Sequence, residues 1–297
     1  MKILNFGSLN IDYTYLVDHF VRAGETLASD SLEIFCGGKG LNQSIALKRS
    51  GVDVWHAGAL GESDGEILLT QLETAGVDTT YIQKLKDKTG HAMIQKDGDG
   101  QNCILLYGGA NQSISKSHVD HVLEDFDSDD FILLQNEISE VGYIMEQAHK
   151  KSMKIVLNPS PINQKIFEYP LNYVDYFLLN EIEAEDICKR KGTGEEMLGW
   201  LSELFPEAKI LLTLGQDGAL YKDGNTLIRQ HIYKVPVVDT TAAGDTFTGY
   251  FVGGLAAGEP LKQALDNAAK ASAIAVSRSG ASPSIPTRSE IEQNQFL

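Results

Sequence analysis

Short apolar runs alternate with helix-like segments through most of the chain, and this alternation limits the possible folds more than any other feature. Runs that predict strands lie at residues 131–134, 154–157, 176–179 and 210–213. Because these runs are almost entirely apolar, we expect strands buried on both faces, joined by the helical crossovers that parallel strands require. The sequence therefore predicts an α/β protein with a mainly parallel central sheet flanked by helices.

Two segments break this rhythm. Residues 13–36 and 89–107 alternate apolar and polar side chains around polar turns and contain no crossover helix. Such alternation is typical of strands that expose one face. We therefore expect a small sheet inserted into a single domain that spans residues 1–297.

Polar residues recur where the predicted strands end. The carboxyl ends of parallel strands meet at one edge of a sheet, and open α/β sheets place their ligands there. Each such residue could be a simple turn former. The whole series instead favours an active-site rim made of Asn10, Asp12, Glu137, Asn158, Asn180, Glu183 and Asp245.

Residues 232–251 predict a strand at 232–238, a tight turn and then a helix. Ala242, Ala243 and Gly244 place little bulk over the helix start. The first backbone N–H groups of a helix have no partner within it, and the helix dipole is positive at this end. The segment can therefore receive an anion such as a phosphate group.

Asp245 is unusual at such a position, because a carboxylate repels a bound phosphate. Two interpretations are open. A carboxylate near a helix N-terminus is common and can be purely structural. Alternatively, Asp245 is a general base that takes a proton from a hydroxyl while the amides stabilise charge on a transferring phosphoryl group.

Composition excludes some classes of partner. The 297 residues carry a formal charge of −16, which argues against nucleic acid and anionic membranes as partners. A local nest of amides can still bind phosphate. The three cysteines, Cys36, Cys103 and Cys188, are too widely spaced for a disulfide framework or a cysteine zinc site. The start of the chain predicts a strand rather than a signal peptide, so we expect a cytoplasmic enzyme.

Two glycine-rich motifs carry a family resemblance. Residues 37–43 (GGKGLNQ) and 239–245 (DTTAAGD) resemble the two signatures of the ribokinase-like, or PfkB-type, carbohydrate kinases. Smaller matching pieces lie in the same order, so the resemblance covers nearly the entire chain, and it is strongest with the ribokinase branch. It implies the ribokinase-like three-layer fold, with a β-sheet lid formed by residues of about 11–36 and 88–110.

The resemblance also implies roles for matching residues. Asp245 would be the base, and the amides of Ala242, Ala243, Gly244 and Asp245 would form the anion hole. Thr213 and Gly215 would line the nucleotide site, while Asn180 and Glu183 would organise Mg²⁺ and phosphates, mostly through water. The sugar hydroxyls would be held by Asn10, Asp12, Gly38, Lys39, Asn42, Glu137 and Asp245.

A potassium ion and a partner subunit are implied as well. A pair of loops would enclose K⁺, largely with backbone carbonyls, and the residues concerned are Asp239, Thr241, Arg278, Gly280 and Ser284. The lid in relatives often forms a dimer contact, so we expect a homodimer through the lid.

Both lines of reasoning predict an ATP-dependent sugar kinase. The expected reaction transfers the γ-phosphoryl group of ATP to a hydroxyl of a small sugar, with D-ribose giving ribose 5-phosphate. Alternatives are a kinase of the same fold for deoxyribose, a ketohexose or a nucleoside, and a non-catalytic sensor of sugar or nucleotide. An intact Asp245 beside Gly244 argues against the sensor.

Overall fold

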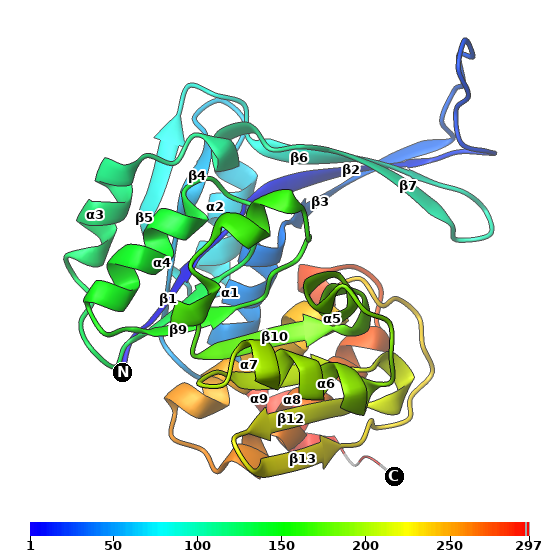
Figure 1. Ribbon diagram of the computed structural model, residues 1–297. Coiled ribbons are helices and arrows are strands. Elements are labelled where there is room, and N and C mark those ends of the chain that lie inside the picture. Colours follow the sequence, from blue (N-terminus) through cyan, green and yellow to red (C-terminus); the bar gives the residue numbers. More distant parts are fainter. Residues whose placement is uncertain (295, 297) are drawn as a thin grey trace.

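A nine-stranded sheet forms the centre of the computed structural model, which describes residues 1–294 and 296 (Figure 1). Its strand order is β13-β12-β11-β10-β9-β8-β1-β4-β5. The seven strands from β11 to β5 in this order run parallel, whereas β12 and β13 are antiparallel. The strands are β1 (Ile3–Phe6), β4 (Val54–Gly61), β5 (Asp78–Leu85), β8 (Phe131–Leu134), β9 (Lys154–Leu157), β10 (Tyr176–Asn180), β11 (Lys209–Thr213), β12 (Ala219–Asp223) and β13 (Thr226–Gln230).

Two hydrophobic cores, one on each face of this sheet, explain the apolar runs. Along β8, Ile132 and Leu134 pack into one core, whereas Phe131 and Leu133 pack into the other. The first core is closed by helices α3 (Lys116–Leu123), α4 (Val141–Lys150), α5 (Glu181–Cys188) and α6 (Gly194–Leu204). The second is closed by α1 (Lys39–Arg49), α2 (Glu66–Thr74), α7 (Ala243–Ala256), α8 (Leu261–Val276) and α9 (Arg288–Gln293). The predicted three-layer α/β architecture is confirmed.

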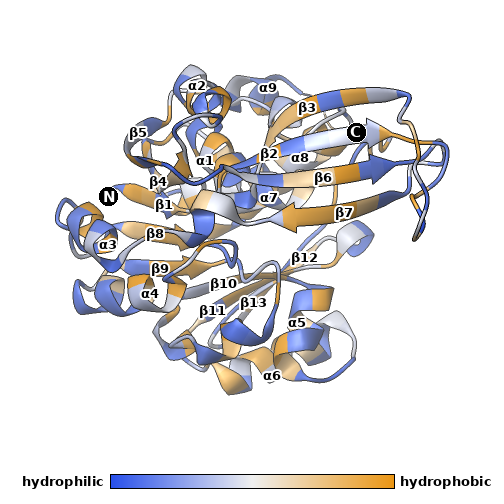
Figure 2. Cartoon of the chain, turned by 90° about the horizontal axis from the view of Figure 1, so that it is seen from above, coloured by the Kyte–Doolittle hydropathy of each residue, from blue (hydrophilic) through white to orange (hydrophobic). Residues whose placement is uncertain are grey.

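A second sheet of four strands, in the order β3-β2-β6-β7, projects from the body of the molecule (Figure 1). It consists of β2 (Asn10–Leu16), β3 (Ser31–Gly37), β6 (Gly90–Lys96) and β7 (Asn102–Tyr107). Every residue of β7 is exposed, although most are apolar, as the hydropathy colours in Figure 2 show. The predicted small sheet is therefore present, and its action as a lid stays a prediction.

The strand predicted at residues 232–238 is wrong. Residues 231–242 form neither helix nor strand. The backbone N–H groups of Val238 and Asp239 both donate to the carbonyl of Val276, at 2.8 and 3.2 Å, rather than to a neighbouring strand. Pro236 has no N–H to give to a sheet. The β-branched composition of this segment therefore leads to an extended connection and not to a strand.

The sequence analysis also overlooked the β12–β13 hairpin. Asp223 pairs with Thr226 across a two-residue turn that contains Gly224, whose φ is +53°. Glycine favours this left-handed conformation. The hairpin adds two antiparallel strands to the edge of the parallel sheet.

In the described part of the chain, no helix has both the length and the apolar character to cross a membrane.

Candidate active site

The first turns of helices α1 and α7 meet at the carboxyl ends of the central strands. Asn42 Nδ2 donates to Asp245 Oδ2 at 3.0 Å, and Gln43 Nε2 donates to Asp245 Oδ1 at 2.8 Å. Each carboxylate oxygen of Asp245 is therefore held by one amide from α1. Asp245 is only 6% exposed. The two glycine-rich motifs, about 200 positions apart in the sequence, thus form a single site.

The start of α7 is open to an anion. Its N-cap residue, Ala242, offers no side-chain hydrogen bond. Among the described residues, no protein acceptor pairs with the backbone N–H groups of Gly244 and Asp245. A Cβ atom added at Gly244 would meet nothing within 4 Å, so packing does not demand a glycine there. The free N–H groups and the empty space suit a phosphate at the positive end of the helix.

A cavity of about 200 Å³ connects this helix start with the nucleotide residues predicted from the sequence. Asn180, Glu183 and Thr213 line it together with Lys39 and Asp245. Thr241 and Gly244 also border the cavity. The structure therefore brings together residues predicted to bind sugar, nucleotide and phosphate.

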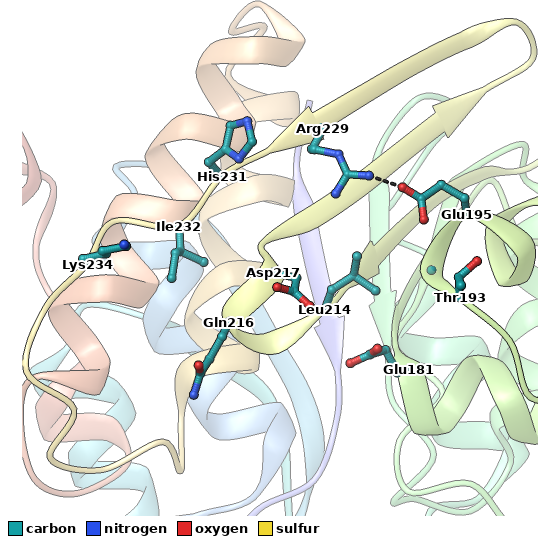
Figure 3. Close-up of a pocket in the computed structure, with 11 residues that line it drawn as sticks. Glu181, Thr193, Glu195, Leu214, Gln216, Asp217, Arg229, His231, Ile232 and Lys234 are labelled. Atoms are coloured by element: carbon teal, nitrogen blue, oxygen red, sulfur yellow. Dashed lines mark hydrogen bonds and ion pairs between the residues drawn. The ribbon is translucent and has the colours of Figure 1, made fainter.

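A larger cavity of about 600 Å³ lies beside the β11–β12 connection, which forms part of its wall (Figure 3). It is lined by Leu214, Gln216, Arg229 and His231, and an ion pair joins Arg229 to Glu195 on α6. The predicted residues Thr213 and Gly215 flank Leu214 but do not line this cavity. We place the reaction in the smaller cavity, because only it combines the carboxylate of Asp245 with the open start of α7.

Lys39 is surrounded by acidic groups. Burial by itself would lower the pKa of Lys39, but the nearby carboxylates of Asp245, Glu137 and Glu183 outweigh burial and raise it. The lysine is therefore a permanent cation within the cavity. It can offset the negative charge of phosphate groups that arrive beside three carboxylates.

The predicted sugar residues line the neighbouring part of the site. Asn10 Oδ1 accepts a hydrogen bond from Asn111 Nδ2 at 2.8 Å, and Glu137 Oε2 accepts from the backbone N–H of Lys39 at 3.0 Å. Burial, reinforced by the charge of Glu137, raises the pKa of Asp12 to about 7. Burial also raises the pKa of Glu137. The two carboxylates lie near each other in a poorly solvated site.

Two glycines allow the backbone to approach these residues. A Cβ atom at Gly37 would lie 2.0 Å from Asp12 Oδ2, so only glycine leaves room for that carboxylate. Gly38 has a φ of +94°, and a Cβ atom there would lie 3.0 Å from the carbonyl oxygen of Ser8. The left-handed conformation favours glycine. The shape of the site therefore requires glycine at positions 37 and 38.

Three further polar residues of the site were not among the predicted site residues. Ser8 Oγ donates to Glu137 Oε2, and it accepts from the N–H of Gly40 at 3.2 Å. Asn111 fixes Asn10 and also bonds both backbone groups of Leu9. Gln43 holds Asp245. Gln43 lies within the motif at residues 37–43, whereas nothing in the local sequence singles out Ser8 or Asn111.

Asn180 and Glu183 form the start of α5. Asn180 Oδ1 accepts from the N–H of Glu183 at 2.9 Å, and Glu183 Oε2 accepts from the N–H of Asn180 at 2.9 Å. This reciprocal pair is a capping box, so both residues have a structural role. Burial raises the pKa of Glu183.

The donor set of the cavity fits a magnesium ion that keeps most of its water. Among the described residues, no group of three or more His, Cys, Asp or Glu side chains could hold a metal by itself. Mg²⁺ commonly binds through one or two carboxylates together with substrate phosphates and water. Glu183 on the cavity wall supplies such a carboxylate, and Asn180 lies beside it.

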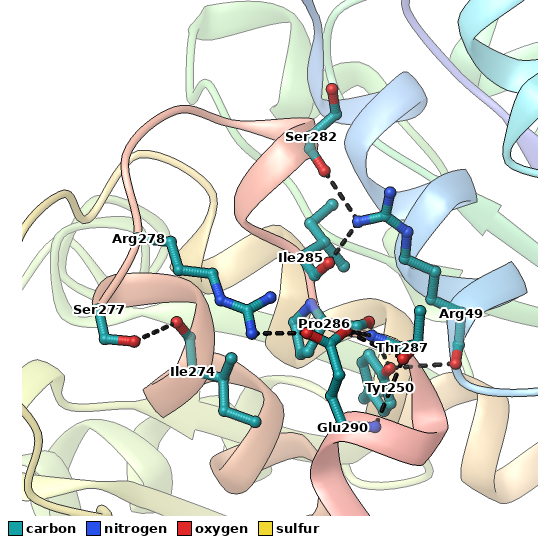
Figure 4. A network of polar contacts seen from close by, with 10 residues as sticks. All are labelled: Arg49, Tyr250, Ile274, Ser277, Arg278, Ser282, Ile285, Pro286, Thr287 and Glu290. Carbon is teal, nitrogen blue, oxygen red and sulfur yellow. Dashed lines mark hydrogen bonds and ion pairs between the residues drawn. The ribbon is translucent and has the colours of Figure 1, made fainter.

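The predicted cation loops are partly assembled. Asp239 Oδ2 accepts from the N–H of Gly280 at 3.0 Å, and Asp239 Oδ1 accepts from the N–H of Thr241 at 2.9 Å. Asp239 therefore ties the two loops together. The Ser284 side chain is buried and donates to the carbonyl of Ala281. The Arg278 side chain does not join them, because it pairs with Glu290 at 2.6 Å (Figure 4).

Arg49 fixes the second of these loops (Figure 4). Its guanidinium donates to the carbonyls of Ser282 and Ile285. The Tyr250 hydroxyl donates to the carbonyl of Pro286 at 2.7 Å. Helices α1 and α7, which carry Asn42 and Asp245, thus also hold the loop at residues 280–286.

An anion-accepting helix start beside a buried carboxylate suits a phosphotransferase with an alcohol group as acceptor. The family model described as pfkB family carbohydrate kinase matches residues 1–288. The chain therefore belongs to the pfkB family of carbohydrate kinases.

Individual relatives are similar over their full length. The ribokinase of Staphylococcus aureus is 35% identical over 302 residues, covering 98% of this chain and 99% of the relative. The crystal structure of ribokinase from Cryptococcus neoformans in complex with ADP is 34% identical, with a TM-score of 0.86 and coverage of 98% and 99%. Ribokinase of Arabidopsis thaliana complexed with ribose and ATP is 27% identical, with a TM-score of 0.88 and coverage of 98% and 97%.

Proposed function

We propose that this enzyme transfers the γ-phosphoryl group of ATP to D-ribose and releases ribose 5-phosphate. The observation that carries the proposal is the position of Asp245, whose two oxygens are held by Asn42 and Gln43 beside the unpaired amides of α7. The ribokinases similar to this chain, including one with ribose and ATP bound, support ribose as the sugar.

Asp245 acts as the general base in this mechanism. It accepts the proton of the attacking sugar hydroxyl, which becomes nucleophilic as it approaches the γ-phosphorus. General base catalysis of this kind typically contributes ~10²–10⁴-fold to the rate. The free amides of Gly244 and Asp245 donate to the oxygens of the transferring group, whereas the N–H of Ala243 already donates to the carbonyl of Thr240 at 3.2 Å. Each well-placed donor contributes about 3 kcal/mol.

The sugar lies among Asn10, Asp12, Asn42 and Glu137. The Oδ1 atom of Asn42 is buried and has no hydrogen-bond partner among the described residues. A buried acceptor without a partner is costly. A sugar hydroxyl that donates to this oxygen removes the cost. The nitrogen of the same Asn42 amide lies 3.0 Å from Asp245 Oδ2, so the hydroxyl is bound close to the proposed base. Gly38 completes the sugar site with its backbone, and Lys39 contributes its positive charge.

ATP lies along the other side of the cavity, with its phosphates between Lys39 and the start of α7. Thr213 and Gly215 line the nucleotide site. Asn180 and Glu183 hold Mg²⁺ mostly through water molecules. When bound, Mg²⁺ would neutralise negative charge on the phosphate groups. Use of ATP supports a cytoplasmic location for the enzyme.

The loops joined by Asp239 are the site of a potassium ion. Their carbonyl oxygens, together with the carboxylate of Asp239, are the hard ligands that such a cation takes. Thr241 lies between Asp239 and the anion-binding amides, and Gly280 and Ser284 belong to the second loop. The ion adds positive charge close to the anion hole. Arg278 contributes its backbone only, because its guanidinium pairs with Glu290.

The four-stranded sheet is a lid and a dimer interface. Leu32, Ile34, Met93 and Leu105 are 48%, 49%, 44% and 69% exposed. The strand register places all four on the same face of the small sheet, which we call the apolar lid face. An apolar sheet face of this kind is characteristic of a surface that a partner covers. A second copy of the chain is the partner proposed here.

A panel of acceptors with ATP, followed by ADP release, tests the proposed function. It contains D-ribose, deoxyribose, a ketohexose and a nucleoside, and kcat/KM is measured for each. The highest value is expected for ribose, with the phosphate on the 5-hydroxyl by NMR. A higher value for another acceptor reassigns the substrate. Binding of sugar and ATP without turnover on any acceptor indicates a sensor instead.

A further inference from the structure

Gln43 and the buried amides behind it have no part in the reaction as described so far. We propose that Gln43 is a positioning residue, which fixes the orientation of the Asp245 carboxylate through a chain of buried hydrogen bonds. This inference rests on the proposed role of Asp245 as base. It assigns to the sequence around Asn42 a second task besides binding the sugar.

Gln43 uses every hydrogen-bonding atom of its side chain. Its Nε2 atom donates to Asp245 Oδ1 at 2.8 Å and to Asn158 Oδ1 at 3.1 Å. Its Oε1 atom accepts from Gln135 Nε2 at 2.7 Å. Gln43 is 0% exposed. Its amide therefore has one orientation, in which the nitrogen faces Asp245.

The chain continues away from the active site. Gln135 Nε2 also donates to Asn5 Oδ1 at 2.9 Å, and Asn5 Nδ2 donates to the Ser44 hydroxyl at 2.8 Å. Ser44 in turn contacts His56 Nδ1 at 2.8 Å. The side chains that make up this series of hydrogen bonds are fully or almost fully buried. Four residues, on β1, α1 and β4 and directly after β8, thus brace the amide that holds Asp245.

The pattern of donors shows that this chain positions a group and does not conduct protons. Both hydrogens of the amide nitrogens of Asn5, Gln43 and Gln135 are engaged. Rotation of Asn5 or Gln43 by 180° would place nitrogen against nitrogen, and rotation of Gln135 would place its oxygen against the oxygens of Asn5 and Gln43. Gln135 donates in both directions along the chain. A proton cannot pass through such a sequence of neutral amides.

The far end of the chain carries no charge. Burial lowers the pKa of His56 to about 3, so its imidazole is neutral wherever the enzyme works. The titratable group that the chain reaches at its other end is Asp245. The amide donors that lead from Asn5 to Asp245 are all engaged, although Gln135 Oε1 and His56 Nε2 have no partner among the described residues. Buried hydrogen bonds of this kind favour one geometry. The network therefore gives Asp245 a fixed direction and leaves its negative charge unchanged.

Gln43→Met tests the inference, because methionine keeps the length of the side chain but cannot donate to Asp245. Misplacement of a catalytic group by about 1 Å can cost ~10²-fold in rate. We expect kcat to fall about 10- to 100-fold. The KM values for sugar and ATP should stay within about threefold, because Asn42 and the nucleotide residues are intact.

Asn267→Leu is the matched control. Asn267 is a buried amide on α8, 5% exposed, and it bonds Glu259 and Gln263 near the opposite end of α7 from Asp245. Its substitution should lower the melting temperature to a similar extent and leave kcat unchanged. An equal loss of kcat in both variants would mean that general destabilisation explains the effect, and would overturn the inference.

Gln43→Glu provides a second readout that a merely structural role would not move. When protonated, the new carboxyl has the shape of the amide and donates to Asp245, whereas its ionised form repels Asp245. The kcat of Gln43→Glu relative to Gln43→Met should therefore rise as the pH falls from 8 to 6. A ratio that does not change with pH overturns the positioning role.

The test separates this inference from the proposed function. Wild-type enzyme and Asp245→Asn are measured beside the Gln43 variants. If wild type phosphorylates a sugar and Asp245→Asn is inactive, but Gln43→Met keeps wild-type kcat, only the inference is wrong. If Asp245→Asn keeps wild-type kcat, the base assignment is wrong and the inference falls with it.

Discussion

Gly249 on α7 packs against Ala46 on α1 with no space for a methyl group between them. A Cβ atom at Gly249 would lie 2.3 Å from the Ala46 Cβ and 2.8 Å from the Leu47 nitrogen. One turn further along, a Cβ atom at Gly253 would lie 2.0 Å from the Ser50 hydroxyl. The two helices therefore touch along their backbones. This close contact sets the distance at which Asn42 and Gln43 meet Asp245.

Gly249→Ala should separate the helices and weaken both folding and catalysis. Overpacking of a core typically costs about 1–3 kcal/mol of unfolding free energy. We expect that loss in urea denaturation, together with a lower kcat. Gly199→Ala on α6 is the control, because a Cβ atom there meets nothing within 4 Å. It should leave kcat unchanged and stabilise the protein by about 0.5–1 kcal/mol.

Asp245→Asn should retain binding of ATP and sugar while kcat falls by ~10²–10⁴-fold. Asparagine keeps the size of the side chain but cannot accept the hydroxyl proton. Calorimetric titration measures binding, and release of ADP measures turnover. A variant with near wild-type kcat would show that another group removes the proton.

Asp12 should make the protein less stable as the pH rises. Its pKa of about 7 in the folded state lies above the ordinary 3.8, through burial first and then the charge of Glu137. Between these two values the folded protein holds a proton that the unfolded chain has lost. Stability from this group therefore falls as the pH rises from about 4 to about 7.

Asp12→Asn removes this dependence. The melting temperature of the variant should exceed that of wild type at pH 8, and the difference should shrink toward pH 4. Asp99→Asn, at an exposed turn, should show no such trend. A difference that stays constant with pH would contradict the raised pKa of Asp12.

Leu105→Glu should dissociate the proposed homodimer. Leu105 is the most exposed member of the apolar lid face, and a carboxylate in a covered apolar interface is strongly unfavourable. Analytical ultracentrifugation should give a dimer for wild type and a monomer for the variant. Leu227→Glu, at a 58% exposed leucine on β13, should remain dimeric. A monomeric wild type would exclude the interface.

Asp239→Ala should abolish stimulation by potassium. The carboxylate holds Thr241 and Gly280 together, so its removal releases both loops. Wild-type kcat should rise when K⁺ replaces tetramethylammonium, whereas the variant should respond equally to both ions. Wild-type activity that does not depend on the cation would remove the ion from the proposal.

Candidate residues within the motifs could be picked out from the sequence, because the residue types around them are unusual for their position in a helix or strand. Asp245 and Gly244 follow from small residues at a helix start, and Asn10 and Asp12 follow from the end of a strand. Gln43 was not predictable, since its role depends on Gln135 and Asn158, which are about 90 and 115 positions away. The strand predicted at 232–238 failed because β-branched residues fit any extended segment, and only pairing makes a strand.

Strand β2 carries Asn10 and Asp12 at one end and runs into the projecting sheet at the other. In the proposed enzyme the same strand would contact the sugar at one end and the partner subunit at the other, so binding of one can affect binding of the other. By thermodynamic reciprocity, a partner that tightens the hold on sugar is itself held more tightly when sugar is present. Dilution, which dissociates a dimer, should then lower the affinity of the enzyme for the sugar.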